Sequence, residues 1–166
     1  MKMIYFKKLN ELRKNKSQLE KKLNTKITLK GRQVTLISKN PLDEYEASII
    51  LDAMNFGFSA KKVLMIKEQE MLFRIINIKN FTRKKNLNEV RARIIGTKGR
   101  TKRTIEDISN CHILIKDNEV GIICNAYDIE EIITGITNLI RGTKQSNTYR
   151  YLEKMNRRKK EIDYNI

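Results

Sequence analysis

The fold of this chain is decided by the stretch Arg93-Ile94-Ile95-Gly96-Thr97-Lys98-Gly99-Arg100-Thr101-Lys102-Arg103. Its two glycines stand at G-x-x-G spacing, with basic residues before, between and after them. Apolar residues at helical spacing precede the loop (Val90, Ile94) and follow it (Ile105). The pattern predicts two helices joined by a short basic loop, where glycine lets an anion approach the backbone and a helix N-terminus closely. A helix C-cap followed by a turn is the alternative for the two glycines alone.

Composition limits the kinds of function that the chain can have. With 166 residues, 40% of them hydrophobic, it is long enough for one ordinary domain or two small ones. Its two cysteines and its one histidine, His112, make neither a disulfide framework nor a metal cluster, so no cofactor is expected. No apolar run reaches the ~20 residues of a membrane span. The charged start from Met1 to Lys16 lacks a signal-peptide core, which predicts a cytoplasmic protein without membrane contacts.

The net charge of +16 is distributed unevenly along the chain. Residues 1–32 hold eleven Lys or Arg against two acids, residues 79–103 hold ten against one, and residues 141–166 hold eight against three. Such segregation is typical of a surface that binds a polyanion. A compositional bias toward lysine is the alternative, but it would not by itself leave residues 104–140 with one lysine and seven acids.

The chain contains an internal repeat with an offset of 86 residues. The offset aligns Glu20 with Glu106, and it aligns apolar residues through a strand-like pair and a helix-like stretch. The aligned apolar pairs are Leu19/Ile105, Ile27/Ile113, Leu29/Ile115, Val34/Val120, Leu36/Ile122, Ile37/Ile123, Ile50/Ile136 and Met54/Ile140. We therefore expect two copies of one unit, at 1–66 and 71–166.

The second copy is predicted to run strand, helix, helix, strand, strand, helix. A tight turn at Asp117-Asn118 would place Cys111 opposite Cys124. A further basic helix is expected after the unit, capped by Ser146 or Asn147. The expected strands are 71–78, 111–116 and 119–124, and the expected helices are 87–95, 100–109, 127–141 and about 148–160.

The first copy repeats the later half of this unit but not its front. Strands are expected at 26–29 and 33–38, and helices after the capping residue Asn40 and after Ser59. The 86-residue offset places Asn10 and Arg13 where the second copy has its glycines, and a gapped register places Arg13 and Lys16 there, so neither register restores a glycine. Because a Cβ obstructs close approach to the backbone, this copy is predicted to be degenerate and to serve packing, support or a protein contact.

The order β-α-α-β-β-α with the loop between Ile95 and Arg103 resembles a type I KH domain, which clamps about four nucleotides of single-stranded nucleic acid. The expected fold class is therefore α+β: two tandem type I KH-like domains (βααββα), the first degenerate, plus a C-terminal basic helix. A narrower resemblance is to the two-KH small-subunit ribosome-assembly factor known as the partner of the Nob endonuclease. It is carried by Arg93 to Glu106, the hairpin, and the run Gly142-Thr143-Lys144…Thr148-Tyr149-Arg150-Tyr151-Leu152-Glu153. An archaeal member is the better match, because eukaryotic members carry a long N-terminal extension.

This resemblance implies a non-enzymatic, RNA-binding protein of ribosome assembly and rRNA processing. It implies binding to single-stranded RNA in the 3′ region of (pre-)16S ribosomal RNA through the second KH domain. It also implies contacts with the Nob endonuclease and with the alpha subunit of translation initiation factor two. Without glycines in the first copy, RNA contact at residues 10–16 is in doubt. The alternative is a general single-stranded RNA-binding KH protein in translation or RNA decay.

The residues expected to bind RNA form two groups. The loop glycines would admit the sugar-phosphate backbone, basic side chains would meet phosphates, and Ile95 and Ile113 would line the floor beneath the bases. The last helix would present a basic face with Tyr149 and Tyr151 for stacking; a solvated tail is the alternative. The full set is Arg93, Ile95, Gly96, Thr97, Lys98, Gly99, Arg100, Lys102, Arg103, Ile113, Arg150, Lys154, Arg157 and Arg158, and the basic face also includes Lys159 and Lys160.

An enzyme is not expected from these residues. The loop from Gly96 to Gly99 lacks the glycine spacing of a nucleotide-binding P-loop. Glu106 and Asp107 are adjacent, so they point to different faces of a helix and make a poor metal pair.

Overall fold

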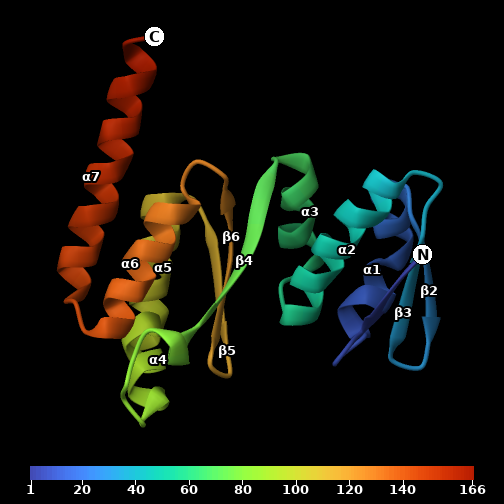
Figure 1. The fold of residues 1–166 in the computed structure, drawn as a ribbon, viewed down its shortest axis with the longest axis horizontal. Coiled ribbons are helices and arrows are strands. Elements are labelled where there is room, and N and C mark those ends of the chain that lie inside the picture. The colour runs from blue at the N-terminus through green and yellow to red at the C-terminus, as the bar shows by residue number, and fades with distance from the viewer. The chain divides into compact units, whose positions relative to one another are not determined.

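The computed structural model describes residues 1–166, which form two compact units, Met1–Phe73 and Arg74–Ile166 (Figure 1). Each unit combines helices with a three-stranded sheet, so the predicted α+β class with two KH-like units is confirmed. Residues 71–73 group with the first unit, where the Phe73 ring packs edge-on against Phe56 and Phe58 with ring centroids 6.0 Å apart.

The second unit has the predicted order β-α-α-β-β-α followed by one more helix. Its sheet has the order β4-β6-β5, and the central strand β6 is buried continuously from Val120 to Cys124. The elements are β4 (Met71–Asn77), α4 (Leu87–Ile95), α5 (Arg100–Ser109), β5 (His112–Lys116), β6 (Glu119–Asn125), α6 (Ile129–Arg141) and α7 (Gln145–Tyr164), with short 3-10 turns at Ile78–Asn80 (η1) and Thr97–Gly99 (η2).

The β5–β6 hairpin has the predicted register. His112 pairs with Ile123 and Lys116 with Glu119, which leaves a two-residue turn and brings Cys111 opposite Cys124. Both thiols are free and buried. Burial raises the pKa of both, that of Cys124 to about 12. The two side chains are therefore protonated at neutral pH and serve as small apolar residues of the core.

The first unit contains a second, smaller sheet in the order β1-β3-β2. Its long helix α2 begins as predicted, because Pro41 is the first helical residue and the Asn40 side chain accepts a hydrogen bond from the Leu42 N–H at 3.0 Å. The elements are β1 (Lys2–Tyr5), α1 (Asn10–Leu23), β2 (Lys26–Lys30), β3 (Gln33–Ile37), α2 (Pro41–Phe56) and α3 (Ala60–Glu68).

The internal repeat extends to individual hydrogen bonds. In the second unit Glu106 Oε1 accepts the Ile113 N–H at 2.8 Å and pairs with Lys102 at 3.2 Å. In the first unit Glu20 Oε1 accepts the Ile27 N–H at 2.8 Å and pairs with the lysine four residues before it at 3.5 Å. Each contact recurs 86 residues later, so α1 corresponds to α5, and the predicted offset is confirmed.

The front of the first unit differs from the prediction. β1 ends at Tyr5 and α1 begins at Asn10, so no helix equivalent to α4 and no glycine loop lie between them. The full βααββα order therefore holds only in the second unit, and the first reads β-α-β-β-α-α. Asn10 and Arg13 lie in the first turn of α1 with exposed side chains, so the first unit lacks the whole helix and loop, not only two glycines.

Helix α7 is longer than predicted at both ends. It begins at Gln145 after Lys144, with no side-chain cap, so the prediction of Ser146 or Asn147 as N-cap is wrong. The early start follows from packing, because Thr148 and Leu152 are buried and meet α6 at Gly135, where a Cβ would lie 3.4 Å from both side chains. No helix in the structure combines the length and apolar character needed to cross a membrane.

Candidate nucleic-acid interface

The glycine loop that joins α4 to α5 contains three residues with positive φ. Gly96, Lys98 and Gly99 have φ of +74°, +52° and +75°. Two hydrogen bonds close the turn: the Gly96 N–H donates to the Ala92 carbonyl at 2.8 Å, and the Gly99 N–H donates to the Gly96 carbonyl at 3.1 Å. This backbone turns the chain sharply and starts α5 directly after the second glycine.

The two glycines have different physical roles. A Cβ on Gly96 would lie 2.2 Å from Thr101 Oγ1 and 2.6 Å from the Thr101 backbone nitrogen. Both distances are too short for atoms that are not bonded to one another. A Cβ on Gly99 would meet nothing within 4 Å. Gly96 is therefore required for the turn itself, whereas Gly99 leaves bare backbone facing open space, into which a ligand can come close.

The outer surface of the loop carries unengaged cations next to a helix N-terminus. Thr97, Lys98 and Arg100 are exposed, and neither basic side chain forms an ion pair. Helix α5 begins with no side-chain cap and no acidic residue in its first turn. The Arg100 N–H donates to the Thr97 carbonyl, and the positive end of the helix dipole at this surface favours an anion.

Two other predicted RNA ligands, Arg103 and Lys102, have partners within the protein, and a third, Arg93, lies beside the end of α6. Arg103 Nη2 donates to the Lys98 carbonyl at 2.7 Å and so braces the loop. Lys102 forms its ion pair with Glu106. Arg93 Nη1 lies 3.1 Å from the position that a Cβ on Gly142 would occupy, at the C-terminal end of α6, where the helix dipole favours a cation.

The two predicted floor residues lie in different environments. Ile95, the last residue of α4, is 36% exposed beside Gly96 and can contact a ligand. Ile113 is 1% exposed, so it belongs to the core beneath β5 and cannot touch bases. The prediction for Ile113 is wrong, because an alternating strand pattern identifies the buried face without distinguishing a core from a binding floor.

Arg91 is a positioning residue that the sequence did not reveal. Its Nη1 donates to the Asp117 carbonyl at 2.6 Å and to Asn118 Oδ1 at 3.2 Å, which ties α4 to the tip of the β5–β6 hairpin. The Asn118 carbonyl in turn accepts the Ile78 N–H at 2.8 Å. These contacts join segments 26 or more residues apart, and no local sequence pattern indicates them.

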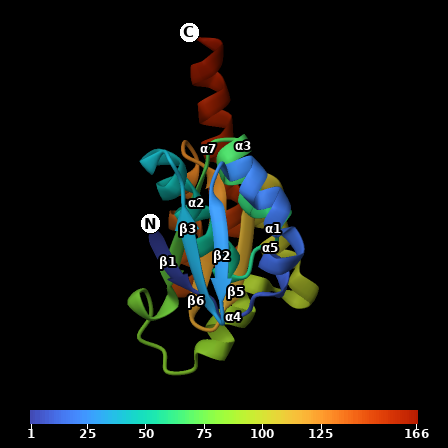
Figure 2. The same cartoon turned by 90° about the vertical axis from the view of Figure 1, so that its right-hand side faces the viewer.

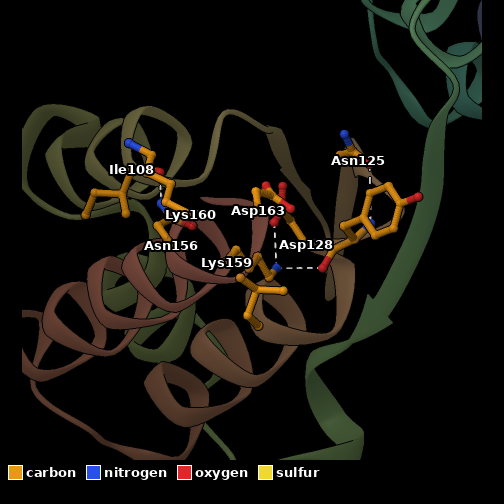
Figure 3. A pocket seen from close by; sticks show the side chains of 9 residues that line it. Ile108, Asn125, Asp128, Asn156, Lys159, Lys160 and Asp163 are labelled. Carbon is orange, nitrogen blue, oxygen red and sulfur yellow. Dashed lines mark hydrogen bonds and ion pairs between the residues drawn. The ribbon is translucent and has the colours of Figure 1, made fainter. Parts of the chain in front are cut away.

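One side of α7 anchors the helix to the domain (Figure 3). Lys159 Nζ lies 2.6 Å from Asp128 Oδ1 and 3.1 Å from Glu131 Oε2, and Asn156 donates to the Ile108 carbonyl. Burial disfavours the Lys159 charge, but the hydrogen bonds to the two carboxylates outweigh it and raise the pKa of Lys159. The prediction that Lys159 belongs to a free basic face is therefore wrong.

The other side of α7 carries the predicted basic cluster. Arg150, Lys154, Arg157 and Arg158 border a shallow depression of about 470 Å³ together with Glu161. All four cations are exposed. No group of three or more His, Cys, Asp or Glu side chains in the structure is placed to hold a metal ion.

The β-α-α-β-β-α order, the G-x-x-G loop between the first two helices and the hairpin tied to α4 define a type I KH domain. Residues 72–157 match the family model for the second KH domain of PNO1, described as a eukaryotic type KH domain (KH-domain type I). The chain belongs to this family of KH proteins, the PNO1/Dim2 family.

Comparisons with individual proteins agree with this assignment. The chain superposes on Dim2p from Pyrococcus horikoshii OT3 with a TM-score of 0.82 and 31% identity, over 92% of this chain and 98% of that one. A second structure from the same organism, a complex of a/eIF2alpha, aDim2p and rRNA, matches with a TM-score of 0.80 and 31% identity, over 96% and 94% of the two chains.

Curated relatives are longer than this chain. A KH domain-containing protein of Methanocaldococcus jannaschii is 25% identical over 145 residues, which are 84% of this chain and 64% of that protein. The pre-rRNA-processing protein pno1 of Emericella nidulans is 28% identical over 148 residues, 84% of this chain and 57% of that protein. The chain thus spans a little over half the length of these relatives.

The contrast between the two glycines predicts different stability costs. Gly99→Ala should lower the free energy of unfolding by about 1–2 kcal/mol, the cost of placing a Cβ in left-handed backbone without a clash. Gly96→Ala adds the collision with Thr101 and should cost roughly 3 kcal/mol or more. Urea denaturation of both variants measures the difference, and equal costs would contradict the assignment of Gly96 as the residue that closes the turn.

The ion pairs of α7 predict a second contrast. Lys159→Ala leaves Asp128 and Glu131 without their cation, so it should lower the free energy of unfolding by roughly 1–2 kcal/mol. Lys160→Ala removes the same charge from the next, exposed position and should change stability by less than about 0.5 kcal/mol. Chemical denaturation at neutral pH compares them, and similar values would show that the pairs add nothing.

Proposed function

We propose that this protein binds single-stranded RNA in the 3′ region of the (pre-)16S ribosomal RNA through the glycine loop of its second KH domain. Its role is that of a non-enzymatic platform in maturation of the small ribosomal subunit. The observation that carries the proposal is the loop itself: open space beside Gly99, exposed Lys98 and Arg100, and an uncapped helix N-terminus occur at one place. Such a surface suits a phosphodiester backbone.

The loop can hold a backbone while Ile95 contacts a base. Charge on Lys98 and Arg100 attracts phosphates, and the positive end of the α5 dipole adds to this attraction. Arg103 keeps the loop in shape by bonding to the Lys98 carbonyl. The basic cluster on α7 offers additional, non-directional attraction, as phosphate contacts typically do in protein–nucleic acid complexes.

Relatives support ribosomal RNA as the ligand. The Pyrococcus aDim2p, 31% identical, has been solved in complex with rRNA and a/eIF2alpha. The Emericella relative is named as a pre-rRNA-processing protein. We extend the rRNA ligand and the role in pre-rRNA processing to this chain, with the 3′ region of the 16S rRNA as the target. The proposed protein partners are the alpha subunit of translation initiation factor two and the Nob endonuclease.

Reversing the charge of the loop tests the site. Thr97→Asp/Lys98→Asp keeps both glycines, and aspartate tolerates the left-handed conformation of residue 98 better than most residues. RNA affinity should fall at least tenfold, about 1.4 kcal/mol, because carboxylates repel phosphates. The matched control is Ser59→Asp/Lys61→Asp, the same charge change at the exposed start of α3 in the first unit. Equal losses in the two variants, measured by titration of labelled RNA, would exclude the loop as the clamp.

Crosslinking in cells tests the target. Wild-type protein should recover the 3′ end of small-subunit rRNA, and the loop variant should recover much less of it. Recovery of scattered messenger RNA instead would favour a general RNA-binding role in translation or decay.

A further inference from the structure

The first unit exposes one whole face of its sheet. Helices α1 and α2 pack on one side of β1-β3-β2, and Figure 2 looks onto the strands from the other side. Alternation fixes which side chains lie there, because Ile4, Val34, Leu36 and Ile27 are buried on the helix side. The outward residues are Met3 and Tyr5 on β1, Gln33, Thr35 and Ile37 on β3, and Lys26, Thr28 and Lys30 on β2.

The strand register orders these residues into rows. Tyr5, Gln33 and Lys30 form one row, and Met3, Thr35 and Thr28 form the next. One edge of the face is therefore apolar and aromatic, and the opposite edge is basic, about 10 Å away across two strand spacings. Tyr5 is 64% exposed and Met3 is 57% exposed. Large side chains of this kind on a free sheet face gain no hydrophobic stabilisation while they contact water.

The face carries positive charge without compensation. No acidic residue occurs in β1, β2 or β3. Lys26 and Lys30 are exposed, as is Arg32 in the β2–β3 turn, and none of the three forms an ion pair. Tyr5, Lys30 and Arg32 also border a shallow depression of about 430 Å³.

We propose that this sheet face is a second binding site for single-stranded RNA, in which a base stacks on Tyr5 while Lys26, Lys30 and Arg32 meet the phosphates. Aromatic side chains beside a basic track are the general means of holding single strands, because every base offers a face for stacking. The proposal goes beyond the glycine-loop site and does not need it. The first unit, which lacks a glycine loop, binds through its sheet instead.

Charge favours RNA over a protein as the occupant. Lysines at both ends of the edge strand β2 oppose the addition of another strand there. Two copies of this face packed together would bring their lysines into the same interface without acids to pair with. A polyanion with flat apolar groups satisfies both edges of the face.

The chain contains no tryptophan, so a single tryptophan reports on this site in the full-length protein. In Tyr5→Trp, titration with an oligouridine 12-mer at low salt should quench the fluorescence in a saturable manner, since stacked bases quench an indole. Tyr45→Trp is the matched control, because Tyr45 is also 64% exposed but lies on helix α2. Equal quenching at both positions, or none at position 5, would overturn the proposal.

Affinity measurements complete the test. Tyr5→Thr keeps a residue suited to a strand and should weaken binding about tenfold, whereas Tyr5→Phe and Tyr45→Thr should leave it within about twofold. Lys26→Thr/Lys30→Thr should weaken binding more than Lys21→Ala/Lys61→Ala, which removes two exposed helix charges. If Tyr5→Thr instead changes the sedimentation coefficient and leaves RNA affinity unchanged, the face joins copies of the chain and the proposal is wrong.

The loop variant separates the two sites. If Thr97→Asp/Lys98→Asp weakens binding while Tyr5→Thr does not, only the sheet proposal fails. If Tyr5→Thr weakens binding while the loop variant does not, the sheet site stands and the proposed function of the loop fails.

Discussion

The missing Cβ of Gly96 is the constraint on which the proposed RNA-binding surface of the second unit depends. With Thr101 Oγ1 only 2.2 Å from the place where a Cβ would be, the chain can turn from α4 into α5 in the space of four residues. The short turn brings the start of α5 to the surface beside the end of α4. Lys98, Arg100 and Ile95 lie together there, beside the positive end of the α5 dipole.

A strongly basic domain stays folded here because many of its cations have partners inside the protein. Some positive groups act inside the protein: Arg103 holds a loop carbonyl, Arg91 holds the hairpin tip, and Lys159 binds two carboxylates. Others, such as Lys98 and Arg100, have no partner and repel one another weakly at the surface. The unpaired cations attract a polyanion. The cations with partners inside the protein keep the surface in shape while the polyanion binds.

The sequence was sufficient for the G-x-x-G loop, the hairpin register and most helices, because each rests on spacing within a few residues. It was sufficient for the repeat because one constant offset of 86 residues aligns the apolar positions of both copies. It was not sufficient where distant residues decide. Lys159 sits in the basic run Arg157-Arg158-Lys159-Lys160, and only Asp128 and Glu131 on another helix select it for the inner face. Ile113 fits a core strand and a binding floor equally well in sequence. The sequence did not predict that the first unit lacks a helix equivalent to α4. An alignment at a fixed offset shows which residues correspond, but it does not show which elements are absent.

The equivalent contacts of Glu20 and Glu106 define a structural module that both units share. In both units the carboxylate ties a helix to the N–H of the second residue of the following strand, and the order helix, hairpin, helix is the same. This shared module is complete with or without a preceding helix and glycine loop. The segment from Leu87 to Gly99 is therefore not needed for the packing of this module, and the first unit keeps the module without it.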